Sequence, residues 1–185
     1  MLSVLRQRQP GLTIVLEGIH DPHNVSAILR SADGVGIREI QLVYTLEKFP
    51  RLGKKSSASA TKWISRRKFP SIQACYDQLR LEGFHIYATR IGPGSASLYE
   101  LDLVQNVALV FGNEHRGVSD EAAAGADGLM QIPMMGMIQS LNVSVACAVS
   151  LYEACRQRVA AGRYEKSSLP SNALENMFEE WKKKR

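Results

Sequence analysis

Two loops that follow predicted buried strands combine polar side chains with glycine, and they are the first candidates for chemistry. The loop "FGNEHRG", residues 111–117, places Glu114 between Gly112 and Gly117. Glycine allows another backbone or a ligand to approach closely. The segment "IPMMGMIQSLN", residues 132–142, carries three methionines and a glycine ahead of a predicted helix start. Backbone amides at a helix start favour a polar or anionic group, and methionines supply adaptable apolar walls.

Loops of this composition suit a ligand with an apolar face, hydroxyls and a carboxylate, such as a nucleoside joined to an amino acid. An ordinary strand–helix connection whose methionines belong to the core explains the same composition equally well. Ser140 and Asn142 stand in the most apolar part of the chain, so we expect both to be buried. A buried hydroxyl or amide costs about 1–3 kcal/mol unless it is hydrogen-bonded. Helix capping is the alternative role for either side chain.

Five strands and several helices alternate along the chain. Helical periodicity or flanking turn residues predict helices at 22–36, 71–83, 119–126 and 141–162, a short element around Trp63 and a closing amphipathic helix at 169–185. Apolar runs predict strands at 12–19, 39–44, 84–90, 107–112 and 128–134. This order indicates an α/β fold with a mostly parallel sheet covered on both faces. Ligands bind such sheets outside the carboxyl ends of the strands, here in the loops after Glu17, Ala88, Phe111 and Ile132.

Several common site motifs are missing from the sequence. The segments "GVGIRE" and "GPGSAS" lack the third glycine of a dinucleotide fingerprint, and "GKKSS" lacks the upstream glycine of a P-loop. There is no G-x-S-x-G nucleophile motif. Three cysteines without a C-x-x-C pair argue against a disulfide framework and a zinc site. No apolar run reaches the roughly 18 residues that span a membrane, so we expect a cytoplasmic protein.

Basic residues are clustered rather than dispersed. The formal net charge is +5, and residues 51–68 hold seven basic side chains without an acidic one. A solvated surface is the plain explanation, but the missing carboxylates favour phosphate binding. The C-terminal "WKKKR" is a second cluster, and Arg6 with Arg8 a weaker third. The expected RNA-binding residues are Arg51, Lys54, Lys55, Arg66, Arg67, Lys68, Lys182 and Lys183.

Three ordered motifs in the sequence support a family assignment. The segments "HNVSAILRSADGVG", "FGNEHRGVS" and "IPMMGMIQSLNVSVACAVSLYEA" resemble the motifs of the SpoU/TrmH family of RNA 2′-O-ribose methyltransferases, within the SPOUT class, from about Thr13 to Arg158. The resemblance implies a homodimer that uses S-adenosylmethionine and no metal. It also implies a deep trefoil knot in the C-terminal part, where the strand order alone would predict an open sheet. We expect a single domain over residues 1–185, with short helical extensions at about 1–10 and 163–185.

The resemblance also assigns roles to individual residues. Arg30, Asn24, Glu114, Ser140 and Asn142 match catalytic positions. Thr89, Gly112, Asn113, Ile132, Met134 and Leu141 match positions that line the cofactor. Arg30 is the expected central residue. Because a guanidinium pKa exceeds about 12, we favour phosphate binding and oxyanion stabilisation over general-base catalysis for it.

The resemblance is closest to the tRNA-directed members of the family. It implies methyl transfer to the ribose 2′-hydroxyl of a guanosine in the tRNA D-loop. Two alternatives stay open: a ribosomal RNA substrate, and a catalytically silent RNA-binding relative.

Overall fold

One parallel sheet organises the chain, as the strand–helix alternation predicted. The structure is a computed structural model that describes residues 1–45, 48–51 and 60–184. Seven strands lie in the order β3-β2-β1-β6-β4-β7-β5, and all six neighbouring pairs are parallel. The strands are β1 (Leu12–Glu17), β2 (Glu39–Val43), β3 (Ser65–Phe69), β4 (His85–Thr89), β5 (Ala96–Ser97), β6 (Val107–Phe111) and β7 (Gly128–Gln131).

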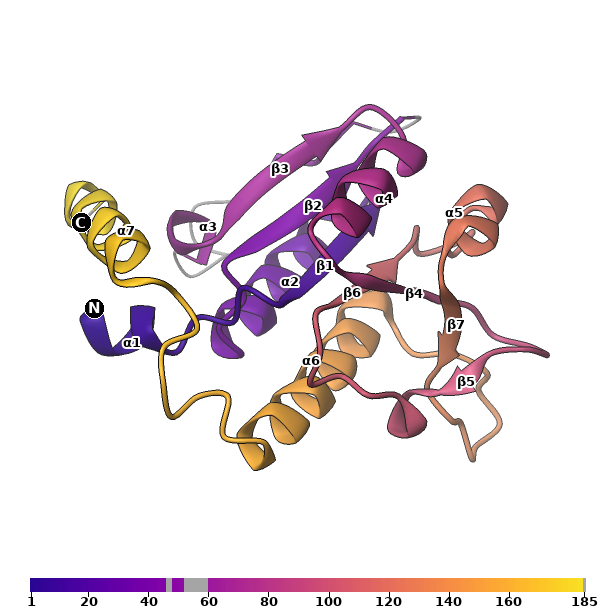
Figure 1. Ribbon diagram of the computed structural model, residues 1–185. Coiled ribbons are helices and arrows are strands. Elements are labelled where there is room, and N and C mark those ends of the chain that lie inside the picture. Colours follow the sequence, from indigo (N-terminus) through magenta and orange to yellow (C-terminus); the bar gives the residue numbers. More distant parts are fainter. Residues whose placement is uncertain (46–47, 52–59, 185) are drawn as a thin grey trace.

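Helices cover both faces of the sheet (Figure 1). They are α1 (Leu2–Arg6), α2 (Pro22–Gly34), α3 (Ala60–Trp63), α4 (Ile72–Leu81), α5 (Asp120–Gly125), α6 (Val143–Ala160), α7 (Ser171–Lys183) and the 3₁₀ turn η1 (Leu98–Glu100). Side chains alternate between the two faces of a strand. Leu12, Ile14 and Leu16 of β1 therefore join the core beneath α2 and α6. Val15 joins the second core, beneath α4 and α5.

Three elements are absent from the sequence prediction. Strand β3 lies within the basic run at the edge of the sheet, and its sequence, Ser-Arg-Arg-Lys-Phe, has no apolar alternation. Charged residues are common on edge strands because they oppose further strand pairing. The two-residue β5 and the 3₁₀ turn η1 are too brief to give a periodic signal, whereas α1 lies within the helical extension expected at about 1–10. The predicted strands and helices otherwise form, with ends that shift by a few residues.

The two ends of the chain lie together beside α3, with α1 next to α7 (Figure 1). Trp181 of α7 is buried, and its ring centroid lies 4.8 Å from that of Trp63 in α3. The guanidinium of Arg8 lies over the same ring at 5.0 Å. The closing helix is thus anchored by an aromatic contact, which places its lysines near β3.

The third basic cluster expected from the sequence is not a surface cluster. Arg8 is buried, donates to the carbonyl oxygen of Ile37 at 2.7 Å and pairs with Asp33. Its charge therefore holds the N-terminal segment against α2 and is not available to a solvent-side partner.

No helix in the described part of the chain is long and apolar enough to cross a membrane. In the same residues, no three His, Cys, Asp or Glu side chains gather as metal ligands would.

Candidate active site

A cavity of about 460 Å³ opens at the carboxyl ends of β4, β6 and β7. Three of the four loops that the sequence singled out form its walls: residues 89–91, 112–118 and 131–141. All six residues expected to line the cofactor border this cavity, namely Thr89, Gly112, Asn113, Ile132, Met134 and Leu141. Pockets of this size and mixed lining are typical of small-molecule sites.

Glu114 connects the fourth loop to the cavity. Its carboxylate accepts hydrogen bonds from the backbone N–H groups of His20 and Asp21 and from Nδ2 of Asn24, each at 3.0 Å. Partial burial raises the pKa of Glu114, but these hydrogen bonds outweigh it and hold the pKa below its ordinary value. The carboxylate is therefore ionised at neutral pH and fixes the start of α2.

Asn24 extends this contact to the third motif. It is buried, and its Oδ1 accepts a hydrogen bond from Nδ2 of Asn142 at 3.2 Å. Residues from all three family motifs thus form one chain, Asn142–Asn24–Glu114. Two of these side chains also bond to backbone groups: Glu114 accepts from the N–H groups of His20 and Asp21, and Asn142 accepts from the N–H of Ser144.

The loop around Gly112 is packed against itself. A methyl group at Gly112 would lie 2.1 Å from the backbone of Gly117, which only glycine avoids. Asn113 organises the same loop: its Nδ2 donates to the carbonyl of Gly18 at 2.8 Å, and its Oδ1 accepts from the N–H groups of His115 and Arg116. Sequence spacing signalled the glycine but not this role of the asparagine.

The expected burial of Ser140 and Asn142 is wrong for the single chain. Both residues are exposed, and the turn from 135 to 140 projects from the surface. Asn142, rather than Ser140, caps α6. Among the three methionines, Met134 borders the cavity, whereas Met135 and Met137 are 94% and 100% exposed. The apolar run therefore marks an exposed surface as well as a core.

Arg30 is exposed on α2 and does not border the cavity of its own chain. Ser140 does border it. The structure thus brings together four of the five expected catalytic residues, directly or through hydrogen bonds, and leaves Arg30 apart from them.

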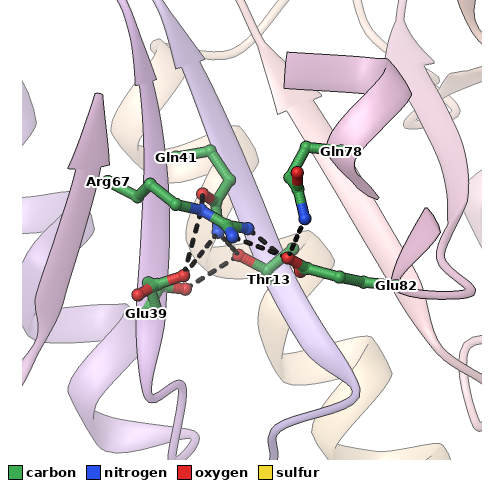
Figure 2. Close-up of polar contacts among 6 residues, drawn as sticks. All are labelled: Thr13, Glu39, Gln41, Arg67, Gln78 and Glu82. Carbon is green, nitrogen blue, oxygen red and sulfur yellow. Dashed lines mark hydrogen bonds and ion pairs between the residues drawn. The ribbon is translucent and has the colours of Figure 1, made fainter. Parts of the chain in front are cut away.

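Arg67, one of the expected RNA-binding residues, is held in a partly exposed network of neighbouring side chains (Figure 2). Its guanidinium donates to Gln41 at 2.9 Å and to both carboxylate oxygens of Glu82, at 2.6 and 3.0 Å. It also pairs with Glu39. The hydrogen bond and charge of Glu82 raise the pKa of Arg67. Strand alternation turns Arg67 towards α4, whereas Arg66 and Lys68 point to the other face.

Arg66, Lys68, Lys182 and Lys183 are exposed, as is Arg51. Lys54 and Lys55 lie outside the described residues. A hollow of about 600 Å³ is bordered by Lys62, Arg66 and Lys184, so the two basic clusters of the sequence meet. The two clusters were expected to be separate, because the sequence alone gives no sign of the Trp63–Trp181 contact.

Three further charged residues border the cavity and were not predicted: Arg90, Arg116 and Asp120. Arg90 follows β4 and Asp120 begins α5, and their side chains form an ion pair at 3.0 Å. Arg90 and Arg116 fall in loops that the strand order had placed at the site, which was the available signal, whereas Asp120 lies just beyond one of these loops, at the start of α5.

Both the sequence and the fold match known proteins. The model of the SpoU rRNA Methylase family matches residues 11–152. The tRNA (guanosine(18)-2′-O)-methyltransferase of Thermus thermophilus is 44% identical over 182 residues, covering 98% of this chain and 93% of the relative. The crystal structure of the A. aeolicus TrmH/SpoU tRNA modifying enzyme superposes with a TM-score of 0.92 at 34% identity, covering 97% and 91% of the two chains. The methyltransferase AviRb of Streptomyces viridochromogenes, solved in complex with AdoMet, superposes with a TM-score of 0.72 at 26% identity, covering 86% and 65%.

Proposed function

This chain belongs to the SpoU rRNA Methylase family, and on that basis we propose that it methylates the ribose 2′-hydroxyl of a guanosine in tRNA, with S-adenosylmethionine as donor. The observation that carries the proposal is the cavity whose wall holds every expected cofactor residue, next to the Asn142–Asn24–Glu114 chain. The guanosine and the D-loop position are supported by the relatives named for guanosine(18) of tRNA.

The cavity fits the donor chemically. Ile132, Leu141, Val143 and Ala146 supply apolar surface for an adenine ring. The tight backbone around Gly112 lets peptide groups approach a ribose closely. When bound, S-adenosylmethionine supplies a methyl group on a positively charged sulfur. The protein must then align a weakly acidic hydroxyl with that methyl and offset the negative charge that develops on the hydroxyl oxygen.

Arg30 is the residue that we propose for the acceptor. Its guanidinium would bind a neighbouring phosphate and stabilise the developing oxyanion, while Asn24 and Glu114 fix the start of the helix that carries it. Because Arg30 does not border the cavity of its own chain, this role requires the cavity of a second copy. Ser140, at the cavity wall, would orient the ribose.

The exposed face of α6 supports a homodimer. Val145, Tyr152 and Val159 recur every seven residues and are 46%, 57% and 59% exposed. Residues at that spacing share one face of a helix. The exposed Met137 and Ile138 belong to the turn that precedes this helix. Exposed apolar side chains that share one face of a helix favour a protein interface there, and a partner that also covered Met137 and Ile138 would bury the turn around Ser140.

The basic hollow is the proposed docking surface for the RNA backbone. Lys62, Arg66 and Lys184 border it. Lys182 and Lys183 are exposed at the end of α7 next to Lys184, and Lys182 forms an exposed ion pair with Glu179. Lysine and arginine side chains that meet phosphates release counterions, so binding should weaken steeply with salt. Arg67 is left out of this surface, because its guanidinium is held by Glu82 and Gln41.

We further propose the knot and domain plan that family membership implies. Residues 1–185 form one methyltransferase domain with helical extensions at about 1–10 and 163–185, and the C-terminal part is knotted. A ribosomal RNA substrate is the second candidate, since the family is named for rRNA methylation.

Mapping ribose methylation in total RNA from cells with and without this protein tests the proposal. Loss of 2′-O-methylation at a tRNA D-loop guanosine is the expected result. Loss confined to ribosomal RNA would favour the second candidate, and an unchanged map would contradict both.

A further inference from the structure

We propose that Arg90 and Asp120 bind the amino-acid end of the cofactor, with Arg90 on its carboxylate and Asp120 on its ammonium. The inference rests on the proposed use of S-adenosylmethionine and assigns a site for one part of that molecule. The structural basis is an ion pair between a loop residue and the first residue of α5, both of which border the same cavity.

Arg90 and Asp120 are held at the cavity rim by their own backbones. The N–H of Arg90 donates to the carbonyl of Met130 at 2.9 Å, which fixes the root of the side chain beside β7. Asp120 is the first residue of α5, and Ser119 caps that helix. The atoms Nη1 of Arg90 and Oδ1 of Asp120 lie 3.0 Å apart.

The ion pair is easily exchanged for other partners. The side chains of Arg90 and Asp120 are 46% and 93% exposed. Exposed pairs contribute at most about 1 kcal/mol, so breaking this one costs little. An amino acid presents one carboxylate and one ammonium a few bonds apart, which is the charge pattern that the pair complements. A guanidinium binds a carboxylate through two parallel hydrogen bonds.

Asp120 is a better partner for the ammonium than the other cavity carboxylate. Glu114 already accepts from two backbone N–H groups and from Asn24, and those bonds hold the start of α2. Binding an ammonium there would compete with the geometry of the site. Asp120 has no comparable structural task.

Arg116 is the competing candidate for the carboxylate, because it also borders the cavity. It borders a second cavity as well, beside Glu17 and Glu121, and Asp120 also borders that cavity. Of the two arginines, Arg90 borders the first cavity but not the second, and its guanidinium pairs with Asp120. The experiment therefore includes a substitution at each arginine.

Three ligands separate the amino-acid end from the nucleoside: S-adenosylhomocysteine, its decarboxylated amine, and 5′-methylthioadenosine, which has neither charge. Calorimetric titration of the full-length protein measures each affinity without any turnover. Arg90→Met should weaken S-adenosylhomocysteine about tenfold and leave the other two within about twofold. Asp120→Asn should weaken the decarboxylated amine by a similar factor and spare 5′-methylthioadenosine.

Arg38→Met is the matched control, since Arg38 is exposed just before β2, at the amino ends of the strands and away from the cavity at their carboxyl ends. It should change none of the affinities. If Arg90→Met leaves S-adenosylhomocysteine unchanged, or weakens all three ligands equally, the inference is wrong. The same holds if Arg116→Met alone produces the selective loss. If the unmodified protein binds none of the three ligands, the proposed cofactor itself fails.

Discussion

Asn142 donates a hydrogen bond to Asn24 at 3.2 Å, although 118 residues separate them in the chain. The contact joins the start of α6 to the first turn of α2. Nδ2 of Asn24 in turn donates a hydrogen bond to the carboxylate of Glu114 at 3.0 Å. Both the oxygen and the nitrogen of each side-chain amide are hydrogen-bonded. Oδ1 of Asn142 also caps α6, and Nδ2 of Asn24 donates to the Glu114 carboxylate. Three sequence motifs therefore act as one rigid unit beside the cavity.

A double-mutant cycle should measure this coupling. Asn24→Ala and Asn142→Ala should each lower the free energy of unfolding by about 1–2 kcal/mol. The double variant should lose less than the sum by at least about 0.5 kcal/mol, because both changes remove the same bond. Urea unfolding gives the values. Asn106→Ala serves as control, because Asn106 is an exposed asparagine just before β6, at the amino ends of the strands. Strict additivity would show that Asn24 and Asn142 do not interact.

Gly112 should not tolerate a side chain. The Cβ of Gly112→Ala would lie 2.1 Å from Gly117 and 2.2 Å from Val118, so the loop must move. We expect a loss of about 1–3 kcal/mol in stability and at least about tenfold weaker binding of S-adenosylhomocysteine. Gly136→Ala is the matched control, since nothing lies within 4 Å of its Cβ. Equal binding by both variants would mean that the Gly112 loop does not shape the cavity.

Much of the fold follows from local patterns. Continuous apolar strands such as Val107–Phe111 and a capped, amphipathic α2 are recognisable in the sequence because their signals lie within a few residues. Ser119 caps α5 as predicted. Strand β3 could not be predicted in this way, since an edge strand made of Ser, Arg, Arg, Lys and Phe owes its conformation to pairing with β2.

The site was predictable as far as its loops, and less so in its details. Strand order places the loops at one edge of the sheet, so the cavity wall was foreseeable. Which charges are available depends on long-range contacts. Arg8 and Arg67 look like surface cations in the sequence, but Asp33 and Glu82 hold them. Arg90 and Asp120 meet because β4, which precedes Arg90, pairs with both β6 and β7, the strands on either side of α5 in the sequence.

Tyr152→Asp should separate the proposed dimer. The substitution places a charge in the middle of the exposed apolar face of α6, where burial against a partner would be costly. Light scattering after gel filtration should give the mass of a monomer. Tyr99→Asp, at a tyrosine with 56% exposure on η1, should stay dimeric. A monomeric unmodified protein would rule out the dimer, and a dimeric Tyr152→Asp would rule out this face.

Trp181→Ala should detach α7 and weaken tRNA binding. The ring packs at a tilt against Trp63 and lies under Arg8, and losing it frees the end of α7, where Lys184 borders the basic hollow. The slope of log affinity against log salt should fall by about one to two, as it should when Lys182 to Arg185 are removed. Trp181→Phe keeps an aromatic contact and should retain most of the slope. Unchanged slopes in both the Ala and the truncated forms would exclude α7 from the RNA surface.

The most direct test of the account is methyl transfer by the purified protein. An unmodified tRNA transcript is incubated with S-adenosylmethionine, digested to nucleosides and analysed by mass spectrometry. The unmodified protein should produce 2′-O-methylguanosine at one D-loop position, and Arg30→Ala should lower the rate at least about 100-fold while S-adenosylhomocysteine binds as before. If no 2′-O-methylated nucleoside forms in tRNA, or if Arg30→Ala retains full activity, the account of this site is contradicted.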